Sequence, residues 1–294
     1  MIIANLNGGL GNQMFQYANA KALAARKGVD FLADVSLYEK RVMHQGFELG
    51  RIFDLPVSLA TKSDLKKVLG IFQSPLANRI LARLPLLRNL PKKFICEPHF
   101  EYWNGLQDCP ENAYIFGYWQ SEKYFLDHEE QIRREFSFKP FIDSVNIELA
   151  QKIKDSPCAV SLHIRRGDFV SNPKANTYHG ALPPSYYADA LKYLSKELPS
   201  LELFVFSDDI EWVKANVDFA THPVHFVSHN TGANSYQDMA LMSLCNHHVI
   251  ANSSFSWWGA WLNPSKDKIV IAPKNWFMQP INTKDLIPSS WIRL

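Results

Sequence analysis

Short apolar segments alternate with helix-like ones through the second half of the chain. Residues 158–164, 201–206, 224–227, 248–251 and 268–272 have the length and composition of buried strands, and segments with helical spacing of apolar residues lie between them. Such alternation predicts a parallel sheet covered by helices on both faces. Ligands of open parallel sheets bind beyond the carboxyl ends of the strands. We therefore expect functional side chains directly after these segments.

The first of these strand ends carries two adjacent arginines. His163 and Arg165 lie two residues apart, so a strand directs both side chains to one face and Arg166 to the other. A guanidinium fixed at a strand end suits two phosphate oxygens, because it has forked donors and a permanent charge. We therefore expect an anion site, most simply for a diphosphate. A structural ion pair among Arg165, Arg166 and Asp168 explains these residues equally well.

Polar groups also follow the other strands. Asp208 and Asp209 suit a loop cap or a ribose contact, and suit a metal ion less well because adjacent carboxylates on a strand point opposite ways. Ser253 and Ser254 offer hydroxyls and N–H groups to a phosphate at a helix start, although an ordinary serine cap fits as well. Asp238 stands near the start of its helix, where it can cap N–H groups or accept hydrogen bonds from a guanine edge.

The first half opens with a strand, a glycine-rich turn and a helix. This is the order of a nucleotide-binding unit, but Met14 stands where the dinucleotide fingerprint needs its third glycine. Asn12 and Gln13 place neutral hydrogen-bonding groups at the helix start, where they suit sugar hydroxyls or simply cap the helix. His44 and Glu48, in a loop-rich region, are candidate acid–base groups or merely solvated side chains.

The composition excludes several classes of protein. The 294 residues carry a formal net charge of +2, which argues against a nucleic-acid binder. The four cysteines are widely spaced, so neither a zinc framework nor a dense disulfide scaffold is indicated, and reduced thiols in the cytoplasm are the simplest interpretation. The N-terminal residues lack the pattern of a signal peptide, and no apolar run is long enough to span a bilayer.

One basic segment, 62–93, has two interpretations. Lysines and arginines are interleaved there with leucines and isoleucines, a pattern that can lie on an anionic membrane surface. A pair of helices packed on the domain, with a solvated basic face, explains the pattern as well. We expect a cytoplasmic protein, with peripheral contact to the inner face of the membrane as the open alternative.

Four motifs stand in order along the chain, at residues 8–18, 163–168, 207–212 and 238–261. Together they resemble glycosyltransferase family eleven, the α-1,2-fucosyltransferases. The second is also similar to the H-x-R-R-G-D motif of α-1,6- and protein O-fucosyltransferases. The resemblance implies an α/β fold of the GT-B type, with two Rossmann-like domains facing across a cleft. We expect an acceptor-binding domain over 1–156 and a GDP-fucose-binding domain over 157–294.

The resemblance also implies an activity. Fucose would pass from GDP-fucose, with inversion and without a metal, to the 2-hydroxyl of a terminal galactose. The acceptor would be an oligosaccharide or a lipid-linked glycan, as in O-antigen and lipopolysaccharide biosynthesis. Two other readings stay open: a GDP-sugar transferase with another sugar or linkage, and a non-catalytic module that binds nucleotide sugars.

Roles for single residues follow from the resemblance. Arg165 would bind the β-phosphate, with His163 beside the nucleotide, and Asp238 would read the guanine. The other expected donor contacts come from strand ends and the serine-lined helix start: Asp208, Ser253, Ser254 and Phe255. The expected acceptor-side residues come from the glycine turn and the loop region that follows the second strand: Gly9, Gly11, Asn12, Gln13, His44 and Glu48.

The catalytic base is left unassigned by the resemblance. In the α-1,6 relatives the base is a glutamate ten residues after the motif histidine, and Pro173 occupies that position here. Asp168 is our first candidate, and it could equally be a structural partner of Arg166. Behind it stand three residues of the first half: Asp34, His44 and Glu48.

Overall fold

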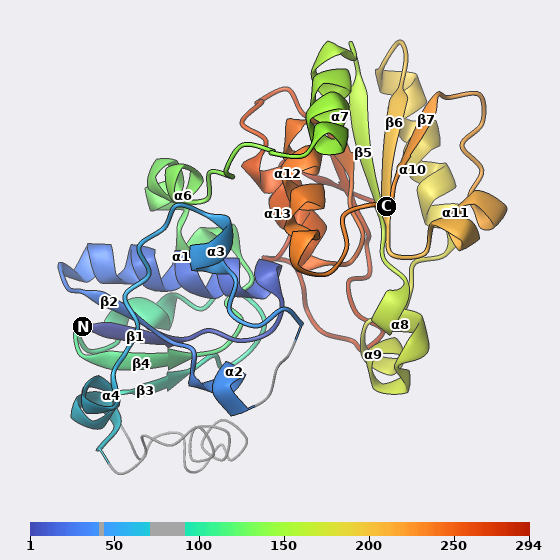
Figure 1. Ribbon diagram of the computed structural model, residues 1–294. Coiled ribbons are helices and arrows are strands. Elements are labelled where there is room, and N and C mark those ends of the chain that lie inside the picture. Colours follow the sequence, from blue (N-terminus) through green and yellow to red (C-terminus); the bar gives the residue numbers. More distant parts are fainter. Residues whose placement is uncertain (41–43, 71–91) are drawn as a thin grey trace. The chain divides into compact units, whose positions relative to one another are not determined.

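The structure is a computed structural model that describes residues 1–40, 44–70 and 92–294, apart from the side chains of residues 40, 168, 171, 174 and 175 (Figure 1). Contacts divide the chain into two compact units. Unit 1 comprises Met1–Lys139 and Asn282–Leu286, and unit 2 comprises Pro140–Ile281 and Ile287–Leu294. Each unit is built on its own parallel sheet.

Unit 1 contains a four-stranded parallel sheet with the strand order β2-β1-β4-β3. Its elements in chain order are β1 (Ile2–Asn5), α1 (Leu10–Lys27), β2 (Phe31–Asp34), α2 (Ser36–Lys40), α3 (Leu49–Ile52), α4 (Lys62–Leu69), β3 (Phe94–Cys96), the 3-10 helix η3 (Asn104–Asp108), β4 (Ala113–Phe116), the 3-10 helices η4 (Glu122–Tyr124) and η5 (Leu126–His128), and α6 (Glu129–Glu135).

The first strand, glycine turn and helix form where the sequence predicts them. All four residues of β1 are buried, as expected for a central strand of a parallel sheet. Helix α1 ends at Gly28, which adopts a left-handed conformation with φ of 63° and donates its N–H to the carbonyls of Ala24 and Ala25. Glycine suits this position because it has no Cβ to clash there.

Unit 2 contains a six-stranded parallel sheet with the strand order β10-β9-β8-β5-β6-β7. Its elements in chain order are α7 (Ser144–Asp155), β5 (Ala159–Ile164), α8 (Gly167–Ser171), α9 (Pro173–Tyr178), α10 (Pro184–Glu197), β6 (Glu202–Ser207), α11 (Ile210–Asn216), β7 (Val224–Val227), η6 (Gly232–Asn234), α12 (Tyr236–Leu244), β8 (His247–Val249), α13 (Ser254–Leu262), β9 (Val270–Ala272) and β10 (Ile292–Arg293).

Helices cover both faces of the unit 2 sheet, as the alternating sequence predicts (Figure 1). On one face Val160 and Leu162 of β5 belong to a core cluster with Leu191 of α10. On the other face Phe204 of β6 packs in a cluster with Leu241 of α12. Every residue of β5 is buried. The ends of β5 and β6 are therefore held rigidly, and they are the strands that carry the arginine and aspartate pairs.

Helix α7 belongs to unit 2, although the sequence boundary at Pro157 places it in the first domain. Its residues Ala150 and Ile153 are buried in one core cluster with Phe204 and Leu241. The contacts therefore divide the chain between Lys139 and Pro140. The expected boundary between residues 156 and 157 put this helix in the first domain, whereas its apolar face packs in the core of unit 2.

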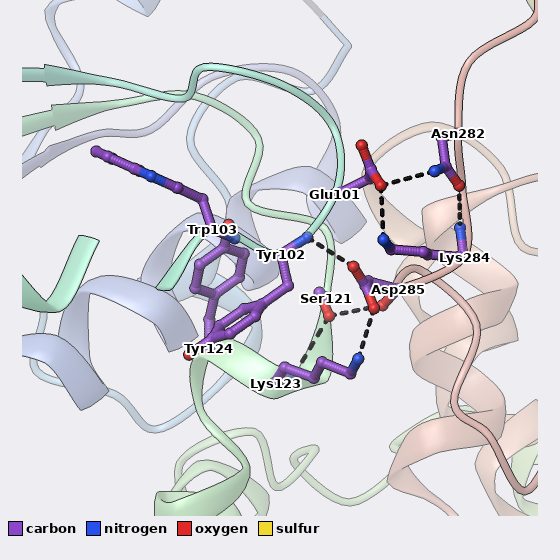
Figure 2. Close-up of polar contacts among 9 residues, drawn as sticks. All are labelled: Glu101, Tyr102, Trp103, Ser121, Lys123, Tyr124, Asn282, Lys284 and Asp285. Carbon is purple, nitrogen blue, oxygen red and sulfur yellow. Dashed lines mark hydrogen bonds and ion pairs between the residues drawn. The ribbon is translucent and has the colours of Figure 1, made fainter. Parts of the chain in front are cut away.

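A short segment near the C-terminus returns to unit 1 (Figure 2). The buried carboxylate of Asp285 accepts hydrogen bonds from the backbone N–H of Tyr102, at 3.0 Å, and from the Lys123 ammonium, at 2.5 Å. The backbone carbonyl of Asp285 accepts a further bond from the Ser121 hydroxyl, at 2.6 Å. Nearby, Glu101 accepts from Lys284 at 2.8 Å and from Asn282 at 2.6 Å. No motif in the sequence indicates this return.

No helix within residues 1–40, 44–70 and 92–294 is long and apolar enough to cross a membrane. Of the basic segment 62–93, the structure describes residues 62–70, which include α4, and residues 92–93, while 71–91 lies outside the described residues. In α4, Leu65, Val68 and Leu69 are buried in the unit 1 core, and Lys66 and Lys67 are exposed. The described part agrees with a packed helix that has a solvated basic face, and membrane contact stays a prediction.

Candidate active site

The loop after β5 is organised by Asp208, which follows β6. One carboxylate oxygen of Asp208 accepts from the backbone N–H groups of Arg166, at 2.8 Å, and Gly167, at 3.0 Å. The other lies 2.6 Å from Nη1 of Arg165. A Cβ on Gly167 would lie 2.5 Å from that second oxygen, so a larger residue here would displace the Asp208 carboxylate. Asp208 therefore fixes both the loop and the direction of the Arg165 guanidinium.

Arg166 is held separately, by Asp209 and Trp212. Its Nε donates to Asp209 Oδ2 at 3.0 Å, and its guanidinium carbon lies 3.5 Å from the centre of the Trp212 ring. Asp209 also caps α11, because its other oxygen accepts from the N–H of Trp212. Arg166 thus has a structural role. The side chain of Asp168 lies outside the described part of the chain, so its pairing with Arg166 and its role as a base both stay predictions.

His163 is buried beside the arginine loop. Its ring centroid lies 5.9 Å from that of Phe255, at the start of α13. Burial, aided by the charge of Arg165, lowers its pKa to about 4, although Asp208 opposes the shift. The imidazole is therefore neutral near pH 7. Its buried Nδ1 has no hydrogen-bond partner among the described residues, and such an atom usually has one. A ligand bound beside Arg165 could supply it.

The start of α13 is shaped as the sequence predicts for either a serine cap or a phosphate seat. Ser253 is the N-cap, and its hydroxyl accepts from the N–H of Phe255 at 3.3 Å. Ser253, Ser254 and Phe255 are half-buried. The preceding Asn252 is buried, and its side-chain amide donates to the carbonyls of His179, Gly180 and Trp276. The helix mouth is therefore anchored to two other segments of unit 2.

Asp238 lies in the first turn of α12 at the end of a buried polar network. Its Oδ1 accepts from the Asn230 amide at 2.8 Å, and Asn230 in turn exchanges hydrogen bonds with Asn146 of α7. Burial raises the pKa of Asp238 to about 7, with the Asn230 bond opposing the shift. Among the described residues, no cation is paired with this carboxylate. A base edge that presents N–H donors would be a suitable partner.

In unit 1, Gln13 is fully buried and holds the surrounding loops. Its amide nitrogen donates to the carbonyls of Gly8, at 3.1 Å, and Gly46, at 2.9 Å, and its oxygen accepts from the N–H of Glu48 at 2.9 Å. These bonds give the Gln13 amide a structural role in unit 1, and its contact with an acceptor stays a prediction. Gly8 needs its φ of +82°, and a Cβ there would lie 2.8 Å from the Asn12 amide.

The other acceptor-side candidates differ in their accessibility. The exposed His44 ring lies over Gly9, at ordinary contact distance from where a Cβ would stand. Gly11 is buried in the first turn of α1. Asn12 is half-buried, and its oxygen accepts from the Gln120 amide at 2.7 Å. Glu48 is buried and paired with Arg51 at 2.8 Å, although desolvation still raises its pKa.

The sequence offered no motif for Glu97, which follows β3. Its oxygens accept from the backbone N–H groups of Tyr118, at 2.8 Å, and Trp119, at 2.9 Å. Burial raises its pKa to about 7. A Cβ on Gly117 would lie 2.5 Å from Glu97 Cβ, so the glycine is what lets the carboxylate approach. The signal in the sequence that could have identified Glu97 as a site residue is its position directly after a strand.

Across the described residues, no group of three or more His, Cys, Asp and Glu side chains is placed to hold a metal ion. The Asp208–Asp209 pair instead divides between Arg165 and Arg166. The carboxylates of Asp208 and Asp209 therefore do not converge on one point.

Comparison with known families shows to which family the chain belongs. The family model described as "Glycosyl transferase family 11" matches residues 1–294. The chain belongs to glycosyl transferase family 11. It is 38% identical to an "Alpha-1,2-colitosyltransferase" of Escherichia coli, across 100% of this chain and 99% of that protein.

Two further proteins are similar to this family 11 chain. The chain is 37% identical to the "O-antigen biosynthesis glycosyltransferase WbnK" of Escherichia coli, across 98% of this chain and 99% of that protein. It is 27% identical to the human "Galactoside alpha-(1,2)-fucosyltransferase 1", across 87% of this chain and 64% of that protein. The predicted family is therefore confirmed.

Solved structures support the fold of this family 11 chain. The α-1,6-fucosyltransferase NodZ soaked with GDP-fucose matches 90% of this chain and 92% of its own, with a TM-score of 0.54 and 16% identity. The Arabidopsis thaliana FUT1 mutant R284K in complex with GDP matches 94% of this chain and 71% of its own, with a TM-score of 0.51 and 14% identity. The predicted GT-B type fold is confirmed by these likenesses, which concern the fold alone.

Proposed function

We propose that this family 11 chain transfers fucose from GDP-fucose to the 2-hydroxyl of a terminal galactose, with inversion at the fucose C1 and without a metal ion. The single observation that supports this most is the arrangement at the end of β5. Arg165 is fixed by Asp208 at 2.6 Å, and the neighbouring His163 ring packs on Phe255 at the mouth of α13. A rigid cation thus lies close to a helix start that carries serine hydroxyls.

This arrangement suits a nucleotide diphosphate. Helix starts bind anions through N–H groups and the helix dipole. A guanidinium has five donors, so Arg165 can bind a phosphate while it remains bonded to Asp208. Ser253, Ser254 and Phe255 would hold the diphosphate, the orphaned Nδ1 of His163 would face the nucleotide, and Asp238 would accept from the guanine edge.

The transfer needs charge stabilisation on the departing phosphate. The oxygen of the acceptor hydroxyl attacks C1 of fucose, the bond from C1 to the phosphate oxygen breaks, and GDP leaves with the bonding electrons. The hydroxyl proton passes to a base. Negative charge grows on the β-phosphate as the bond breaks, and a preorganised cation lowers the barrier most at such a position. Arg165 is proposed to supply that cation.

Incubation with GDP-fucose and lactose in EDTA tests the proposal. GDP release that depends on lactose, with a product fucosylated at the galactose 2-hydroxyl, is the expected result. Binding of GDP-fucose without turnover would instead favour a non-catalytic nucleotide-sugar module. Turnover that EDTA abolishes and Mg²⁺ restores would refute the metal-free mechanism.

A second donor is favoured by a specific observation. The "Alpha-1,2-colitosyltransferase" shares 38% of residues along the complete chain, compared with 27% for the human fucosyltransferase. Colitose is fucose without its 3-hydroxyl, so a site that hydrogen-bonds this hydroxyl would reject colitose strongly. Competition between GDP-fucose and GDP-colitose, read as the ratio of kcat/KM, distinguishes the two donors. The natural acceptor glycan is proposed only by class, as a galactose-terminated or lipid-linked oligosaccharide.

A further inference from the structure

Polar groups of unit 1 gather where its parallel strands end. We call this set the unit 1 rim, namely residues 5–13, 34–38, 97 and 117–120. Its parts are tied together by hydrogen bonds: Tyr38 to the carbonyl of Gly8 at 2.6 Å, Gln120 to Asn12 at 2.7 Å. Gln16 of α1 adds a bond to the carbonyl of Gly117 at 3.2 Å. The carboxyl edge of a parallel sheet is where ligands bind, and the rim is such an edge.

The carboxylates in and beside the rim are not equivalent. Asp34 is buried, and its two oxygens accept from the N–H of Ser36 and the hydroxyl of Tyr114. Glu48 is buried and paired with Arg51. Both are occupied by structural partners. Asp34 and Glu48 are also almost completely buried, at 3% and 4% exposure, so an incoming hydroxyl has little access to either.

Glu97 differs from both. It is half-buried, and among the described residues no cation is paired with it; its carboxylate is positioned by the two backbone N–H groups of Tyr118 and Trp119. Trp119 holds a left-handed conformation, with φ of 55°, which is costly for a residue other than glycine. The strained turn presents its two donors to Glu97, and the bare Gly117 backbone makes room for the carboxylate.

We propose that Glu97 is the general base that accepts the proton of the acceptor hydroxyl. This inference rests on the proposed function and supplies the group that the family resemblance leaves unassigned. A base must be within hydrogen-bond reach of the proton it takes. Glu97 would take it with one carboxylate oxygen while the backbone N–H bonds keep the group in place, and the acceptor oxygen would attack C1 as the proton leaves.

The surroundings of Glu97 suit this task. Glu97 interacts with two tyrosines, Tyr118 from the loop after β4 and Tyr124 from η4. Burial raises the pKa of each tyrosine, and this glutamate raises it further. They are neutral near pH 7. Burial raises the pKa of Glu97 to about 7, against the two backbone bonds that lower it. A base with a pKa near the working pH combines adequate ionisation with proton affinity.

Glu97→Gln tests the inference through the pH dependence of kcat/KM for the acceptor. Wild-type activity should fall below about pH 7, because the carboxylate becomes protonated. Glu97→Gln should lower kcat/KM at pH 8 by on the order of 10²- to 10⁴-fold, the usual share of a general base. The acid limb should vanish in that variant. Glu97→Asp, which keeps a carboxylate, should keep the limb with a smaller loss.

Controls separate the base from the fold and from the donor site. Glu111→Gln alters an exposed glutamate before β4 and should behave as wild type. GDP affinity, measured by calorimetry, should be unchanged in Glu97→Gln, which shows that unit 2 is intact. An acid limb that persists in Glu97→Gln, and disappears in His44→Ala, would overturn the inference in favour of His44. Wild-type protein that turns over neither GDP-fucose nor GDP-colitose would refute the proposed function, and Glu97 as its base with it.

Discussion

Asp208→Asn is the variant that tests whether Arg165 acts through its fixed position. The asparagine oxygen can still accept from the backbone N–H groups of Arg166 and Gly167, at 2.8 and 3.0 Å in the wild type. The new amide group, however, would direct donors at Nη1 of Arg165, which now lies 2.6 Å from a carboxylate oxygen. The substitution therefore removes the orientation of Arg165 and leaves most of the loop in place.

The magnitude follows from the bond that is lost. A hydrogen bond between charged groups contributes about 1.5–3 kcal/mol. Arg165 and Asp208 are 31% and 27% exposed, so water replaces part of the interaction and the lower value applies. About 1.4 kcal/mol corresponds to a tenfold change in rate. We expect kcat to fall roughly tenfold if this free energy is lost in the transition state, and the free energy of unfolding to fall by no more than about 1.5 kcal/mol.

The assay is GDP release at saturating donor and acceptor in EDTA, with thermal unfolding measured in parallel. Asp209→Asn is the matched control, because it weakens the neighbouring pair with Arg166 at 3.0 Å and keeps an oxygen to cap α11. It should retain nearly full kcat. An unchanged kcat in Asp208→Asn would refute the reasoning, and so would equal losses in both variants, because the loop as a whole would then matter rather than the direction of Arg165.

Three other substitutions follow from the structure. Arg165→Ala should lower kcat by on the order of 10²-fold or more, measured by GDP release, because it removes the charge partner of the leaving phosphate. Asp238→Asn should weaken GDP binding in calorimetry. It should also raise the melting temperature, because burial raises the pKa of Asp238 from 3.8 to about 7 and the ionised wild-type carboxylate is therefore destabilising in the folded protein. The gain should grow as pH rises from 3.8 to about 7 and then level off. Asp285→Ala removes the buried acceptor of Lys123 and of a backbone N–H, and should destabilise unit 1 by about 1–3 kcal/mol in denaturant unfolding.

The fold could be predicted where periodicity is strong. The buried strand 159–164 and the helices beside it gave a parallel sheet because apolar spacing reports directly on the faces of a strand or helix. The same spacing carries no information on which sheet a helix covers, so α7 was separated from unit 2. The return of Asp285 to unit 1 depends on hydrogen bonds between residues more than 160 positions apart, and composition cannot reveal such pairings.

The types of residue at the candidate site could be predicted from the sequence, but their hydrogen-bond and ion-pair partners could not. Residue type and position were enough to predict an anion site where the strand runs into His163 and Arg165, and that site stays a prediction. The sequence could not show that Asp208 holds Arg165, since that contact joins two strand ends. The sequence predicts that Gln13 contacts a sugar, but it could not show that both ends of the Gln13 amide are bonded to backbone groups. Glu97 carried no motif and became visible only through the bonds of its carboxylate.

Four carboxylates near the strand ends and helix starts of this chain differ in their hydrogen-bond partners. We expect the two that are bonded to arginines to be structural and the other two to contact substrates. Asp208 and Asp209 are each bonded to an arginine, and each fixes the position of its partner. Among the described residues, Asp238 is bonded to an amide and Glu97 to two backbone N–H groups, and burial raises the pKa of each to about 7. A desolvated carboxylate without a cation costs stability unless a ligand makes use of it. One such acid therefore suits a guanine edge in unit 2, and the other suits a hydroxyl proton in unit 1.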